Sequence, residues 1–132
     1  MPLGNWPIEA GGPVAISQGT GIMWDPAMQA LTPLFAAISA SSNGNNTIVA
    51  AVTGKKIRVL AYNLMSNGTV NAKFQSGAGG TDLTGLKYFV ANTGIVAPFN
   101  PVGWFETAAA TLLNVNLSAG VAVGGEVVYI TV

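Results

Sequence analysis

Hydrophobic and polar residues alternate with a period of two through most of the chain after residue 34. Val70, Ala72 and Phe74 give the clearest case, because each is followed by a polar residue. Leu113, Val115 and Leu117 alternate similarly with Asn114, Asn116 and Ser118, which are expected to face outward. This period is typical of strands with one buried face. Turn residues separate the apolar runs, and the pattern predicts about eight strands, at residues 35–40, 47–52, 56–65, 69–76, 86–90, 95–99, 108–117 and 121–132. We therefore expect an all-β domain over residues 35–132, a jelly-roll-like β-sandwich.

The strand at 56–65 differs, because both of its alternating sets are apolar. Such a strand is either central and covered on both faces, or its second face meets another subunit. The second interpretation assigns a possible oligomer interface to Leu60, Tyr62 and Leu64.

The turn residues predict the connections between strands. Asn67-Gly68 lies between two strong strands and is typical of a tight hairpin turn. Residues 52–55 predict a second hairpin. Gly124-Gly125 interrupts the last strand pattern, which indicates a bulge, or a kink where a strand changes sheets.

Residues 1–34 are rich in proline and glycine and predict an extended arm. One short helix is expected in it, with Asp25 as the N-cap, Pro26 in the first turn and Pro33 at the end. Apolar anchors in such an arm are costly in water unless they are covered. We expect Trp6, Met23 and Trp24 to dock on their own domain or on a partner.

Charged residues make up only 8% of the chain, whereas 50% of it is hydrophobic. Soluble domains usually carry about a quarter charged residues, and interface cores are depleted in them. We therefore expect an oligomer. The alternative is a monomer whose surface is covered by Asn, Ser, Thr and Gly.

Histidine and cysteine are absent, so the common nucleophilic triads and thiolate or imidazole metal sites cannot form. We expect no enzyme activity, no cofactor and no metal site. The carboxylates show no spacing that singles out a glycosidase pair. The net charge is zero, and the single basic cluster, Lys55, Lys56 and Arg58, predicts a solvated strand start and no nucleic-acid site.

Two further segments have alternative interpretations. The loop at 77–85 lacks the lysine spacing of a phosphate-binding loop and predicts a mobile hairpin loop, with Asp82 as the first candidate for an oxygen-ligand calcium site. Trp104 and Phe105 beside Glu106 form either a sugar-stacking platform or a plug at the end of the sandwich. The uncharged run at 26–54 contains Pro33 and a polar stretch at 41–46, so no membrane span is expected.

Motifs over roughly the last two thirds of the chain resemble small structural proteins of tailed bacteriophages. They are Asn46–Val52, Gly54–Leu60, Val70–Ser76, Thr81–Gly85, Pro98–Pro101, Gly103–Thr107, Leu112–Ala119 and Val121–Gly125. The first 34 residues lie outside this resemblance.

The resemblance implies a capsid decoration (cement) protein on the outside of the phage head. Residues 1–7 lack the basic and apolar segments of a signal peptide, so synthesis in the host cytoplasm is expected. The expected partners are the major capsid protein, bound through the arm, and two further copies in a trimer. The alternatives are a tail or fibre module that binds a host surface glycan and, behind it, a glycan hydrolase domain. The family supplies no catalytic residue.

Overall fold

The computed structural model describes residues 23–24 and 30–132. The chain divides into two units, residues 1–32 and 33–132. In the first unit, β1 (Met23–Trp24) pairs antiparallel with β2 (Ala30–Leu31). The short helix expected to end at Pro33 is therefore wrong at residues 30–31, which form a strand. Residues 25–29 lie outside the described residues. A helix between two prolines this close has few internal hydrogen bonds to offset its costly nucleation.

All the regular secondary-structure elements of the second unit are strands. These are β3 (Leu34–Ala40), β4 (Gly44–Val49), β5 (Ile57–Ser66), β6 (Val70–Ser76), β7 (Thr81–Asp82), β8 (Lys87–Phe89), β9 (Thr93–Ala97), β10 (Phe105–Glu106), β11 (Leu113–Leu117) and β12 (Val123–Thr131). The described part of the chain contains no helix that could cross a membrane.

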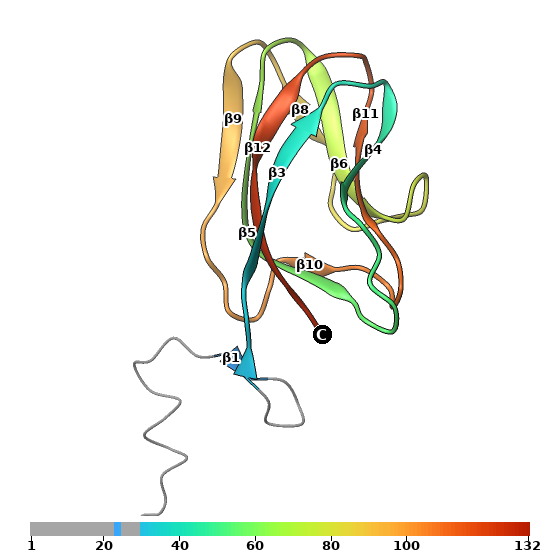
Figure 1. The fold of residues 1–132 in the computed structure, drawn as a ribbon. Coiled ribbons are helices and arrows are strands. Elements are labelled where there is room, and N and C mark those ends of the chain that lie inside the picture. The colour runs from blue at the N-terminus through green and yellow to red at the C-terminus, as the bar shows by residue number, and fades with distance from the viewer. Residues whose placement is uncertain (1–22, 25–29) are drawn as a thin grey trace, which may run out of the picture. The chain divides into compact units, whose positions relative to one another are not determined.

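The strands form two antiparallel sheets that lie as two layers of a β-sandwich (Figure 1). One sheet, called here the β12 sheet, has the order β10-β5-β12-β3, with β9 also paired to β5. The other, called the β11 sheet, has the order β4-β11-β6-β7, with β8 also paired to β6. The predicted all-β class is confirmed.

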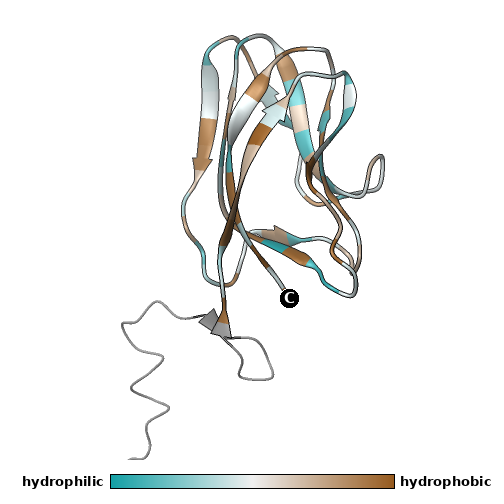
Figure 2. Cartoon of the chain, in the orientation of Figure 1, coloured by the Kyte–Doolittle hydropathy of each residue, from teal (hydrophilic) through white to brown (hydrophobic). Residues whose placement is uncertain are grey.

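The core lies between the two sheets and follows the predicted alternation. Val70, Ala72 and Phe74 of β6 are at most 2% exposed. Phe74 is the largest of the fully buried side chains, and its ring lies 4.9 Å from those of both Tyr62 and Phe105. Burial of each such large apolar side chain contributes about 1.5–3 kcal/mol. Figure 2 shows the hydrophobic segments distributed along the strands of both layers.

Strand positions are predicted better than strand connections. Six predicted strands match observed ones to within two residues at each end: those at 35–40, 56–65, 69–76, 86–90, 95–99 and 121–132 correspond to β3, β5, β6, β8, β9 and β12. Strand β4 begins three residues earlier than predicted, and β11 begins five residues later. The two-residue strands β7 and β10 are too short to produce an alternation and were not predicted.

The predicted hairpin at Asn67-Gly68 is wrong, because β5 and β6 belong to different sheets. A type I′ hairpin turn needs positive φ at both central residues, and neither Asn67 nor Gly68 has it. Instead, Ser66 Oγ accepts a hydrogen bond from Gly68 N at 3.1 Å, and the chain crosses from one sheet to the other.

The turn predicted at 52–55 is present, with Lys55 N donating to Val52 O at 3.0 Å and Gly54 at φ 70°. It also joins strands of different sheets, β4 and β5, so the hairpin expected there is wrong.

Strand β12 stays in one sheet throughout, so the predicted bulge or kink at Gly124-Gly125 is wrong. The irregularity lies further along, where Val128 pairs with Ala61 but Tyr129 pairs with Val59. Leu60 is therefore an extra residue in β5, a β-bulge. Glycine is required at position 125 for a different reason, because a Cβ there would overlap the backbone carbonyl oxygen of Asn63.

Candidate functional site

The predicted arm anchors fall in the first unit. Trp6 lies outside the described residues. Met23 and Trp24 form β1, with the register Met23 to Leu31 and Trp24 to Ala30. Docking of these residues on a partner remains a prediction.

The predicted oligomer interface needs a correction, because its side chains belong to the interior of the chain. Leu60, Tyr62 and Leu64 are 0%, 7% and 2% exposed. Burial also raises the pKa of the Tyr62 hydroxyl. The bulge at Leu60 shifts the alternation of β5 by one residue, so Ile57 and Val59 before it and Tyr62 and Leu64 after it all join the core cluster. Two apolar sets in the sequence therefore do not mean two apolar faces.

A different surface of the same sheet has the character of an interface. We call it the β12 face: the outward side of β3, β12, β5 and β9. Its central row is Ala37, Glu126, Asn63 and Val96, aligned across the four strands. These residues lie opposite the inward row that contains Val127 and Tyr62, because successive side chains alternate between the faces of a strand.

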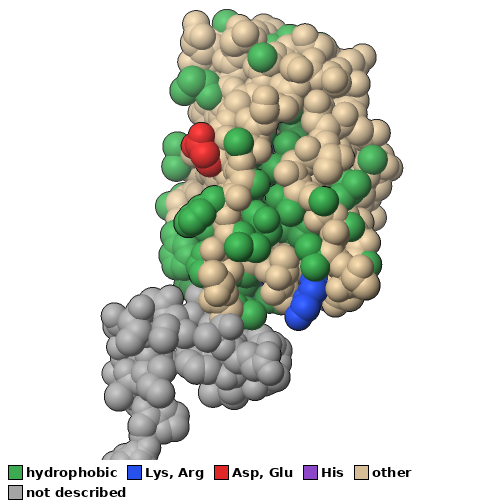
Figure 3. Space-filling model, viewed as in Figure 1, with side chains coloured by type: hydrophobic (Ala, Val, Ile, Leu, Met, Phe, Trp, Pro, Cys, Tyr) green, Lys and Arg blue, Asp and Glu red, His purple; other side chains and the backbone are tan. Residues whose placement is uncertain are grey.

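Large apolar side chains stand on this face without cover among the described residues. Phe35 is 79% exposed, Val96 78% and Met65 60%. Between them the face carries small side chains or none, as at Ala37, Ser39, Ala61, Gly94 and Gly124. Charged side chains are sparse in the view of Figure 3 as well, while hydrophobic ones are frequent. Exposed and nearly uncharged faces of this kind are typical of interaction sites in other proteins.

Three shallow depressions on the β12 face, of about 520, 330 and 200 Å³, share one lining residue, Glu126. It is the single charged residue among those that line them. Its Oε1 accepts a hydrogen bond from Asn63 Nδ2 at 2.9 Å. The remaining lone pairs of this carboxylate are available to a donor from outside the described residues.

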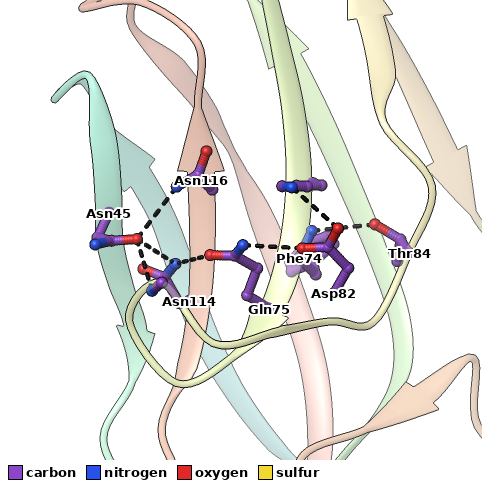
Figure 4. Close-up of polar contacts among 9 residues, drawn as sticks. Asn45, Phe74, Gln75, Asp82, Thr84, Asn114 and Asn116 are labelled. Carbon is purple, nitrogen blue, oxygen red and sulfur yellow. Dashed lines mark hydrogen bonds and ion pairs between the residues drawn. The ribbon is translucent and has the colours of Figure 1, made fainter.

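The outward side of the β11 sheet is polar, and side-chain amides cross it from strand to strand (Figure 4). Asn114 Nδ2 donates to Gln75 Oε1 at 2.9 Å and to Asn45 Oδ1 at 3.1 Å. Gln75 Nε2 then donates to Asp82 Oδ1 at 2.9 Å, and Asn116 Nδ2 donates to Asn45 Oδ1 at 3.2 Å. We call Asn45, Gln75, Asn114 and Asn116 the amide network.

The hairpin expected in the loop at 77–85 is present, because β7 pairs back onto β6. Its turn lies against the amide network: Gly79 N donates to Asn45 Oδ1 at 2.9 Å. Asn114 is 0% exposed and Gln75 5%, although both face outward. Their burial is tolerated because the amides satisfy one another.

Asp82 lies in an ion pair at the end of this network. Its Oδ2 is 3.0 Å from Lys73 Nζ. Two hydrogen bonds, the more important from Gln75 and the other from Lys73, hold the pKa of the Asp82 carboxyl below its usual range. Among the described residues, no group of three or more acidic side chains is placed so that it could hold a metal ion, and Asp82 has no such group around it.

The basic cluster is tied to Glu106. Arg58 Nη2 lies 2.8 Å and Lys56 Nζ 3.3 Å from carboxylate oxygens of this residue. The hydrogen bond from Arg58 is the main reason that the pKa of Glu106 lies below its usual range. Two of the three cations are thereby partly neutralised.

Of the two aromatic residues before Glu106, Phe105 packs against the core cluster. Trp104 is 45% exposed, and its Nε1 donates to Pro98 O at 2.8 Å. Phe105 thus fits the plug interpretation, and Trp104 lies at the margin of the same aromatic group, with its ring 6.4 Å from that of Tyr62.

No protein-family model matches the chain, and no curated protein matches it either. Function must therefore be inferred from the two outer faces of the sandwich. Sequence reasoning missed the β12 face, because Phe35 lies in a run where both alternating sets are apolar or small. It recognised Asn114 and Asn116 as outward residues but had no signal for the turn that covers Asn114.

Proposed function

We propose that the sandwich is a jelly roll and that the chain is a capsid decoration protein of a tailed bacteriophage. The strand order supports the topology. With β7 and β8 taken as one position, and β9 and β10 as another, eight positions run along the chain from β3 to β12. The first pairs with the eighth, the second with the seventh, the third with the sixth and the fourth with the fifth. A long antiparallel ribbon rolled into two sheets has this order.

The observation that carries the functional proposal is the β12 face: exposed Phe35, Met65 and Val96 around a single carboxylate. A subunit that remained alone would keep this surface in water. Depletion of charge with retention of large apolar side chains is typical of the centre of a protein interface. The resemblance of residues 46–125 to phage structural proteins indicates which kind of assembly would cover it.

In this proposal the β12 face forms the contact between copies in a trimer, and the arm with Trp6, Met23 and Trp24 binds the major capsid protein. Stabilisation of the shell would be mechanical. Each bound trimer adds buried surface across a junction between capsid subunits, and mass action favours the closed shell over its open form. The absence of histidine and cysteine is compatible with such a role.

Two valines allow a matched test of the interface. Val96 is 78% exposed on the β12 face, whereas Val102 is 76% exposed outside it. Light scattering on the purified chain should give a trimer for the wild type and for Val102→Asp, and a monomer for Val96→Asp, because the new carboxylate would be buried in the depression that Glu126 already lines, with no cation among its described lining residues. A monomeric wild type, or equal behaviour of the two variants, would overturn the assignment of the β12 face.

The capsid role needs a separate test. Immunogold electron microscopy of tailed-phage particles whose genome encodes this chain, with antibody against the purified chain, should label the head. Label confined to the tail, or none on the particle, would exclude a decoration role and leave the oligomer result standing.

A further inference from the structure

The β11 sheet presents a flat polar surface with one exposed aromatic ring. Tyr88 of β8 is 78% exposed and pairs with Asn71 of β6. Asn71 in turn lies beside Ser118, since Ser118 N donates to Asn71 O at 3.0 Å and Asn71 N donates to Ser118 Oγ at 2.9 Å. Tyr88, Asn71 and Ser118 thus form one row across the sheet, which lies on the outward side because Val70 and Ala72 face the core.

A second row runs parallel to the first, one outward position further along. Lys73 pairs with Asn116, and Asn116 pairs with Asn45. Rows on one face of a sheet are about 7 Å apart, and neighbours within a row are about 5 Å apart. We call these six residues, Tyr88, Asn71, Ser118, Lys73, Asn116 and Asn45, the amide platform.

Three of the six side chains, Asn116, Asn45 and Lys73, are held in place before any ligand arrives. Asn116 Nδ2 is oriented by Asn45 Oδ1 (Figure 4). Lys73 Nζ is oriented by Asp82 Oδ2. Among the described residues, Asn116 Oδ1, Asn45 Nδ2 and the Asn71 amide have no hydrogen-bond partner. Donors and acceptors that are already fixed by a network lose little conformational entropy on binding.

The charge of this surface indicates the class of ligand. Lys73 is its single cation and is paired with Asp82 at 3.0 Å, so no net charge remains to attract a phosphate backbone. Unpaired amides suit hydroxyl groups, which both donate and accept hydrogen bonds. An exposed tyrosine ring offers an apolar surface to the C–H face of a pyranose.

We propose that the amide platform binds a neutral oligosaccharide, with the sugar ring stacked on Tyr88 and its hydroxyls bound by Asn71 and Asn116. This site is independent of the β12 face, because it lies on the other sheet. One copy of the chain is therefore able to use both surfaces at the same time, and either proposal survives the failure of the other.

Saturation-transfer NMR on the purified full chain tests this site. The probes are neutral hexaoses of glucose, mannose, galactose and N-acetylglucosamine at millimolar concentration. We expect at least one to bind, with Tyr88→Ala weakening its affinity about tenfold. Tyr88→Phe should retain most of the affinity because the ring remains, and Asn71→Ala should weaken it without affecting thermal unfolding, since that amide supports no other described group.

Phe99→Ala is the control, because Phe99 is an exposed aromatic residue, 59% exposed, outside the platform. It should bind the same hexaose as tightly as the wild type. Absence of binding by all the probes would overturn the proposal. Equal affinities of Tyr88→Ala and Phe99→Ala would overturn it too, because binding would then occur elsewhere.

Discussion

Asn114 is predicted to be the most important polar side chain for stability, although it lies on the outward side of its sheet. It is 0% exposed and makes three hydrogen bonds: its Nδ2 donates to Gln75 and Asn45, and its Oδ1 accepts from Asn46 N at 2.8 Å. Asn114→Ala leaves Gln75 Oε1 and Asn46 N without these partners. A buried polar group without a partner costs about 1–3 kcal/mol, so we expect a loss of about 2–4 kcal/mol.

Asn116 supplies a matched control two residues along the same strand. It is half-buried and donates one side-chain hydrogen bond, of 3.2 Å, to an oxygen that also accepts from Gly79 and Asn114. Asn116→Ala should therefore cost less than about 1 kcal/mol.

Urea unfolding followed by circular dichroism measures both losses, at one protein concentration because assembly would add to the apparent stability. The larger loss corresponds to a decrease in Tm of roughly 10 °C. If the two variants differed by less than about 0.5 kcal/mol, the amide network would not act as a buried polar unit, and the reasoning would be refuted.

Local alternation predicted those parts of the fold that depend on neighbours in the sequence. The inward set Leu113, Val115 and Leu117 of β11 is at most 1% exposed, as expected from its period of two. The all-β class and most strand positions follow from the same signal, because each strand must bury one face.

Features that depend on distant residues were not predictable in this way. The bulge at Leu60 is one inserted residue, and in the sequence it looks like a second apolar face. Gly125 is required by a carbonyl on the neighbouring strand, 62 positions earlier at Asn63. The pattern therefore suggested a kink in β12, whereas the constraint is a close approach between two backbones.

The candidate surfaces show the same difference between features set by neighbours in the sequence and features set by distant residues. Asn114 was expected on a wet face, and its direction is correct, but the turn at 77–80 covers it. Phe35 gave no signal at all, since exposure of an apolar residue is decided by which elements lie over it. Direction along a strand is a local property, whereas burial is a property of the folded chain.

Two further predictions concern single positions in the β12 sheet. Gly125→Ala should lower the free energy of unfolding by at least about 2 kcal/mol, because the new Cβ would overlap the Asn63 carbonyl. Gly124→Ala should be nearly neutral, since its Cβ would lie 3.8 Å from the nearest atom. Equal denaturation midpoints for the two variants would contradict this. Glu106→Gln tests the ion pair with Arg58. Because the folded protein holds the pKa of Glu106 below its usual range, the carboxylate stabilises the fold above about pH 5, and this contribution is lost as the pH falls through the lowered pKa. The difference in Tm between wild type and variant should therefore be constant from neutral pH down to about pH 5 and shrink below about pH 4. A difference that stayed constant down to about pH 2 would show that the charge of Glu106 is not what stabilises this edge of the sheet.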